Sequence, residues 1–130
     1  MSRSVLSVED RKLDEGTSAK YTATIYDETE TAILLADLTT ITLTLYDYAT
    51  GVIINSRNAQ DVKNTNDVTI TAAGILAWTI KPADNAIITT ALHKSAYERH
   101  IALFEYTWDS GTNAGKHELE LEVRQLNKVT

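Results

Sequence analysis

Apolar and polar residues alternate along several stretches of the chain, and this period of two is the main structural signal. The alternation is clear at residues 19–25 and 41–46, and again near the end, where Leu119, Leu121 and Val123 alternate with charged residues. Successive side chains of a β-strand point to opposite faces, so these stretches predict strands with one apolar and one polar face. No stretch has the length and the 3.6-residue period of a long helix.

Further strands are predicted where short apolar runs lie between turn residues such as glycine, asparagine and aspartate. The predicted segments are residues 52–55, 68–71, 75–80 and 97–108. Pro82 stands near the start of one short helical turn, near residues 82–86, where its missing N–H costs nothing. The pattern predicts an all-β domain with seven to eight strands, arranged as an antiparallel sandwich or a closely related barrel.

The two tryptophans have different predicted environments. Trp78 is in phase with apolar neighbours and is predicted to lie in the core. Trp108 ends the strand 97–108 beside a loop and is predicted to be partly exposed. Because that strand has apolar residues on both faces, it is interpreted either as a covered central strand or as a strand with an aromatic outer face.

Residues 57–67 are rich in Asn, Asp and Lys and are interpreted as a surface loop. Asp61, Asn64, Asn66 and Asp67 could offer oxygen ligands to calcium, but their spacing matches no Ca²⁺ loop. A polar loop is therefore the favoured interpretation of this segment, and no metal site is predicted.

Composition narrows the function classes. The chain has 130 residues, of which 43% are apolar and 23% charged, as in an ordinary globular domain. The absence of cysteine excludes disulfides, thiolate nucleophiles and cysteine-bound zinc. The net charge of −6 and the lack of clustered Lys and Arg argue against a nucleic-acid partner.

We expect three parts in the chain: an N-terminal arm or first edge strand at residues 1–12, a sandwich at residues 13–126 and a tail at residues 127–130. Residues 1–12 turn charged without an apolar core, so no signal peptide is expected. No window approaches the roughly 20 apolar residues of a membrane helix, so no membrane partner is expected either.

Side chains that could support catalysis form no recognisable constellation. His100 and His117 could face each other across the last hairpin as a metal or pH-sensitive pair, although ordinary sheet histidines are favoured. Glu118, Glu120 and Glu122 form a row on what is interpreted as a solvated outer strand, unlike the two carboxylates of a glycosidase, which face each other across a cleft. Neither a Gly-x-Ser-x-Gly motif nor a phosphate-binding glycine loop is present. No enzyme, catalytic residue or cofactor is predicted.

The course of strands and turns resembles the immunoglobulin-like structural domains of tailed bacteriophages, and especially the N-terminal domain of upper baseplate proteins. The resemblance covers residues 13–125 and consists of strand and turn patterns. The segments that carry it are Glu15–Ile25, Leu38–Asp47, Thr50–Asn55, Gly74–Ala86, Tyr97–Tyr106 and His117–Val123.

This resemblance implies an immunoglobulin-like sandwich that serves as a virion structural protein without an active site. Such a protein is assembled in the host cytoplasm, docks onto other virion proteins and forms a homo-oligomer within the assembly. Capsid decoration, the head–tail junction and the tail or baseplate stay open as its place. The candidate interaction surface comprises Arg3, Val5, Leu6, Tyr106 and Trp108. The alternative is a carbohydrate-binding sandwich module that uses exposed aromatics such as Trp108, while a hydrolase has almost no support.

Overall fold

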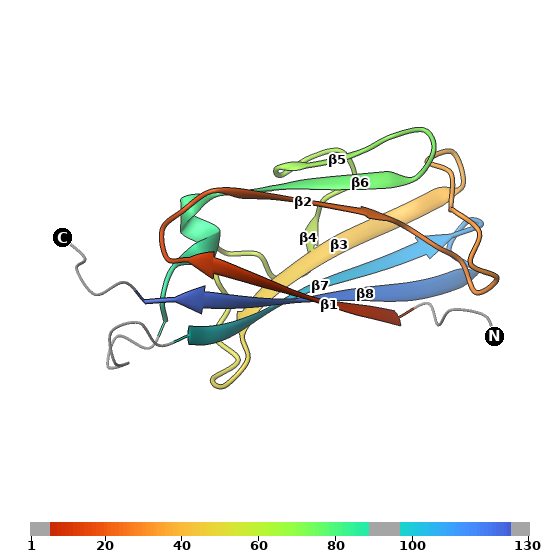
Figure 1. Ribbon diagram of the computed structural model, residues 1–130. Coiled ribbons are helices and arrows are strands. Elements are labelled where there is room, and N and C mark those ends of the chain that lie inside the picture. Colours follow the sequence, from red (N-terminus) through yellow and green to blue (C-terminus); the bar gives the residue numbers. More distant parts are fainter. Residues whose placement is uncertain (1–5, 89–96, 126–130) are drawn as a thin grey trace.

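The computed structural model describes residues 6–88 and 97–125, with side chains from residue 12 onward. These residues form eight strands and one short 3₁₀ helix, η1 (Figure 1). The strands are β1 (Leu6–Asp14), β2 (Ala19–Thr24), β3 (Leu38–Asp47), β4 (Gln60–Asp61), β5 (Val68–Ile70), β6 (Ile75–Ile80), β7 (Tyr97–Trp108) and β8 (Asn113–Arg124), and η1 is Pro82–Asn85. The described part of the chain contains no helix long and apolar enough to cross a membrane.

The strands form two sheets that face each other as an immunoglobulin-like sandwich. The larger sheet has the order β1-β8-β7-β3-β4, and the smaller has the order β2-β6-β5 (Figure 1). All pairs are antiparallel except β1 and β8, which run parallel with Leu6 opposite Lys116 and Asp14 opposite Arg124. The predicted all-β sandwich of seven to eight strands with one helical turn is therefore confirmed.

Alternation explains which side chains fill the space between the sheets. Ile41, Leu43 and Leu45 of β3 are buried, while the threonines between them lie on the outer face. The same two-residue period buries Leu76 and Trp78 of β6, so the predicted core position of Trp78 is confirmed. Apolar residues from both sheets form one continuous core, as a sandwich requires.

Strand β7 lies between β8 and β3, and the aromatic residues of its second half point inward. Phe104, Tyr106 and Trp108 all belong to the core, and Trp108 is only 5% exposed. The predictions of an aromatic outer face and of a partly exposed Trp108 are therefore wrong. The position of Trp108 at the strand end did not expose it, because the loop between β2 and β3 lies against it: Asp37 accepts a backbone hydrogen bond from Asp109.

Two predictions about the segment after β3 are also wrong. Residues 52–55 form no strand beyond a single bridge between Tyr46 and Ile53, because Asn55 and Ser56 have positive φ angles that break an extended chain. The polar segment 57–67 is more than a surface loop. It contains β4, and it carries a buried arginine.

Candidate functional site

The outer face of the larger sheet carries a cluster that we call the tyrosine–arginine patch. Its members share the face that points away from the core, at the end of the sheet where β7 begins. They are Tyr46, Tyr48, Tyr97, Arg99 and Ile101. Tyr48 is 58% exposed and Tyr97 is 48% exposed, whereas Ile101 is only 2% exposed although it lies on the outer face. The patch therefore presents accessible aromatic rings, and Ile101 lies buried beneath its surface.

Arg99 holds the patch together. Its guanidinium lies 4.8 Å from the centre of the Tyr48 ring, and its Nε donates to Glu120 Oε1 at 2.8 Å. The backbone N–H of Tyr48 donates to the Arg99 carbonyl at 2.9 Å, so the turn after β3 is also fixed to β7. Burial raises the pKa of Tyr46, and the nearby Glu118 carboxylate and Tyr48 raise it further. The patch thus presents rings and a cation in a pre-formed arrangement.

A shallow hollow of about 420 Å³ occupies the other end of the same outer face. Threonines of β3 and β7 line it together with Glu105 and Lys116, whose carboxylate and ammonium groups are 3.5 Å apart. Tyr106 also lines the hollow, although it is almost wholly buried. The carboxylate and the ammonium group in the hollow thus form an ion pair.

The glutamate row of β8 does not lie on an edge strand, so that interpretation is wrong. Strand β1 pairs with β8 on the side away from β7, so the row lies on an interior strand of the sheet. Glu120 pairs with Arg99 of β7, and Glu122 lies 3.9 Å from the Lys12 ammonium of β1. The row therefore forms ion pairs that connect β8 with β7 and with β1, and it does not protect an exposed sheet edge.

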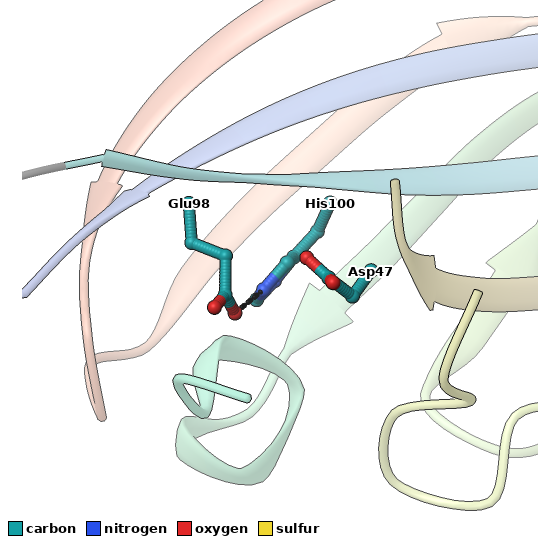
Figure 2. Close-up of side chains that lie close together, drawn as sticks. All are labelled: Asp47, Glu98 and His100. Carbon is teal, nitrogen blue, oxygen red and sulfur yellow. Dashed lines mark hydrogen bonds and ion pairs between the residues drawn. The ribbon is translucent and has the colours of Figure 1, made fainter. Parts of the chain in front are cut away.

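The interior of the sandwich is polar at one end, where Asp47, Glu98 and His100 come together (Figure 2). Asp47 and His100 are direct cross-strand partners of β3 and β7, and Glu98 lies two residues before His100 on the same face. One possible ligand atom from each residue lies within 4.8 Å of the other two. We call this group the buried trio. It is the only set of three metal-ligating side chains found together among the described residues.

Several polar atoms of the buried trio are satisfied. His100 Nε2 and Glu98 Oε1 are 2.5 Å apart, and the Ile88 backbone N–H donates to the same Glu98 oxygen at 2.7 Å. Thr50 donates to Asp47 Oδ2 from its backbone N–H at 3.0 Å and from its hydroxyl at 2.6 Å. Asp47 Oδ1 and His100 Nδ1 are buried without a hydrogen-bond partner. Each such atom costs about 1–3 kcal/mol.

A second buried polar cluster joins the two sheets through Arg57. The Arg57 guanidinium donates to both oxygens of Asp84 on η1, at 2.7 and 3.2 Å, and to Asp67 Oδ2 at 2.9 Å. Its remaining N–H groups donate to Gln60 Oε1 and to the Asn66 carbonyl. Burial by itself lowers the pKa of Arg57, but the bonds to Asp84 and Asp67 outweigh it, and the net shift is upward. This cluster is structural, because every guanidinium N–H already has a partner.

The polar residues that were considered as calcium ligands stabilise the loop through hydrogen bonds and an ion pair. Asn64 Oδ1 accepts from the Ile70 backbone N–H at 2.6 Å, and Asn66 Nδ2 donates to the Asp61 carbonyl at 2.7 Å. Asp67 pairs with Arg57. Their oxygens therefore point to separate partners.

The structure describes only part of the predicted interaction surface. Arg3 and Val5 lie outside the described residues, and only the backbone of Leu6 is described, at the start of edge strand β1. Tyr106 and Trp108 belong to the core. The Tyr106 hydroxyl donates to the Tyr26 carbonyl at 3.1 Å, which fixes the ring inside the sandwich.

The alternative that was not favoured, a facing pair of His100 and His117, does not form. His100 lies opposite Leu121, and His117 lies opposite Phe104, so the two histidines are separated along the hairpin. His117 Nε2 instead hydrogen-bonds the Tyr21 hydroxyl of the smaller sheet. The buried trio was missed because its signal, a Glu-x-His sequence at inward positions of a strand, becomes visible only when the inner face of β7 is known.

Comparisons with known proteins give little beyond the fold. No protein-family model matches the chain, and no curated protein matches it in sequence. Among solved structures, a crystal structure of the titin M3 domain is similar over 96% of each chain, with 12% sequence identity and a TM-score of 0.40.

Proposed function

We propose that this chain is a non-enzymatic structural domain of a tailed bacteriophage particle, which acts by docking onto other virion proteins. The sandwich fold agrees with what the sequence resemblance over residues 13–125 implies. The observation that carries the docking role is the tyrosine–arginine patch, which covers the end of an open sheet face. Tyrosine and arginine are enriched in protein–protein interfaces and among their energetically dominant residues.

The geometry of the patch suits recognition of a protein surface rather than turnover of a small molecule. Tyr48 and Tyr97 supply accessible aromatic rings on the sheet face, whereas Ile101 is buried beneath the surface. Arg99 is already held by Glu120 and Tyr48, so a partner would not have to order this long side chain on binding. We propose that the domain is assembled in the host cytoplasm with several copies in one particle.

An incorporation assay tests this function. A tagged copy of the chain is supplied during infection, and mass spectrometry measures the ratio of tagged to native copies in purified particles. The test variant is Tyr48→Ala combined with Arg99→Ala. Because loss of a dominant interface residue costs about 2 kcal/mol or more, we expect incorporation to fall at least tenfold.

Thr69→Ala is the matched control, because Thr69 is exposed on the outer face of the smaller sheet. It should be incorporated like the wild type, and circular dichroism should show that both variants are folded. Equal incorporation of the patch variant and the wild type would contradict docking through this patch. The tagged wild type could fail to enter particles that contain the native chain. That result would show that the tag, rather than the patch, blocks assembly. The assay is then repeated with an untagged, isotope-labelled chain in place of the tagged one.

A further inference from the structure

The interior end of the sandwich contains three ionisable side chains where an apolar core is expected. Asp47 is 1% exposed, Glu98 6% and His100 0%. Charged groups are buried in proteins when they are paired or when they bind a metal ion. Within the buried trio His100 pairs with Glu98, and among the described residues no cation pairs with the Asp47 carboxylate.

The strand geometry directs all three side chains to one point. Glu98 and His100 lie two residues apart on β7 and so share its inner face, and Asp47 is the residue directly opposite His100 on β3. Figure 2 shows the imidazole between the two carboxylates. Central strands of a sheet hold such side chains rigidly, which is the arrangement that a preorganised ligand set requires.

Asp47 has an unused capacity to bind a ligand. Asp47 Oδ1 and His100 Nδ1 are both buried, and neither has a hydrogen-bond partner. The second oxygen of Asp47 is held by Thr50, so the carboxylate is oriented while Oδ1 remains free. A metal ligand held by a neighbouring donor in this way is typical of built metal sites.

We propose that Asp47, Glu98 and His100 form a binding site for one divalent first-row transition-metal cation of the zinc type. One imidazole and two carboxylates are ligands that Zn²⁺ accepts, at about 2.0–2.2 Å. His100 offers Nε2, because this nitrogen already faces Glu98 Oε1 and only through it can both side chains hold one ion. The proton between Nε2 and Oε1 leaves to solvent, and the 2.5 Å contact opens to about 3.3 Å, as two ligands of one tetrahedral ion require.

Such a site is structural, because its ligands are closed off from solvent. The cation joins β3 to β7, and through the Ile88–Glu98 hydrogen bond it also fixes the segment after η1. Metal uptake is then coupled to folding or to opening of this end of the sandwich. The inference is independent of the docking function, since the trio points inward and the tyrosine–arginine patch points outward.

The test uses the full chain, unfolded with a chelator present and refolded with either Co²⁺, Zn²⁺ or no metal. We expect one cation per chain by native mass spectrometry, visible absorption of tetrahedral Co²⁺, and a higher unfolding temperature with Zn²⁺ than without metal. Asp47→Asn and His100→Gln should each weaken binding more than about 100-fold, because even indirect support of a metal ligand is worth 10–100-fold.

His117→Gln is the matched control, because it removes an imidazole from the same sheet outside the trio and should keep the single cation. The wild type alone can overturn the inference, by binding no cation after refolding with metal. Binding that survives in both Asp47→Asn and His100→Gln would also overturn it, because the cation would then occupy another site. If either variant fails to fold, the wild-type imidazole resonances decide: Zn²⁺ must shift those of His100 and leave those of His117 in place.

Discussion

Arg57 and Asp84 form an ion pair inside the sandwich, with 2.7 Å between Arg57 Nε and Asp84 Oδ1 and at most 2% of either side chain exposed. Arg57 follows β3 of the larger sheet, and Asp84 lies on η1 after β6 of the smaller sheet. The pair therefore fastens the two sheets together. The Lys81 backbone N–H and the Asn55 side-chain amide also donate to the Asp84 carboxylate.

Removing Arg57 leaves Asp84 buried without its counter-ion. We therefore expect Arg57→Met to lower the free energy of unfolding by about 3–5 kcal/mol, measured by urea denaturation. Arg99→Met is the comparison, because Arg99 and Glu120 pair on the outer face, and it should cost about 1 kcal/mol or less. Equal losses in the two variants would show that Arg57 does not act as a buried ion-pair partner.

Two glycines with positive φ angles provide a matched pair of substitutions. Gly74 has a φ of +86°, and a Cβ atom there would lie 2.2 Å from the Ile33 carbonyl oxygen, whereas Gly51 has a φ of +75° with open space around it. Gly51→Ala should cost only the backbone strain of about 1–2 kcal/mol. Gly74→Ala should cost clearly more, because the loop containing Ile33 must also move. If the denaturant midpoints of Gly51→Ala and Gly74→Ala fell by the same amount, the close approach of Gly74 to the Ile33 carbonyl would be contradicted.

Burial raises the pKa of Tyr46 above the ordinary value of about 10. In the unfolded chain Tyr46 ionises at its ordinary pKa, so its contribution to stability is complete below about pH 10 and is lost as the pH rises through the folded pKa. We expect the free energy of unfolding to fall less steeply above pH 10 in Tyr46→Phe than in the wild type. A phenolate absorbance titration should show that this variant lacks one late-titrating tyrosine. If the free energy of unfolding depended on pH in the same way in Tyr46→Phe and in the wild type above pH 10, the upward shift of the Tyr46 pKa would be contradicted.

Both tryptophans are buried, so their fluorescence should be shielded from solvent. We expect acrylamide to quench the folded chain much less than the urea-unfolded chain, and Trp108→Phe to leave the quenching of the remaining Trp78 low. A carbohydrate site built on Trp108 predicts a shift in emission when glycans are added. We expect no such shift, and a saturable shift that disappears in Trp108→Phe would restore the carbohydrate-binding alternative.

Strand positions could be predicted where alternation is strict and turn residues stand at both ends. The predicted segments 75–80 and 97–108 coincide with β6 and β7. The prediction of a strand at residues 52–55 was wrong. Their apolar run has strand propensity, but the positive φ angles of Asn55 and Ser56 end the extended chain. Local propensity does not reveal which turn geometry tertiary contacts will select.

The polar clusters could not be predicted, because they depend on pairing between distant segments. Asp47 and His100 meet only through the register of β3 against β7. Arg57 lies within a stretch with the composition of a surface loop, and it is buried because Asp84, 27 residues later, neutralises it. The outer-face position of the patch likewise required knowledge of which face of β7 is inward.

The most direct test of the central proposal, that the chain belongs to a tailed phage particle, is quantitative mass spectrometry of particles purified from the source of the chain. The account predicts that the native chain is a stoichiometric component of the particle. A copy number in the hundreds would place it on the capsid, and a small multiple of three would place it along the tail axis or its junctions. Particles that assemble and infect without any copy of the chain would contradict the account.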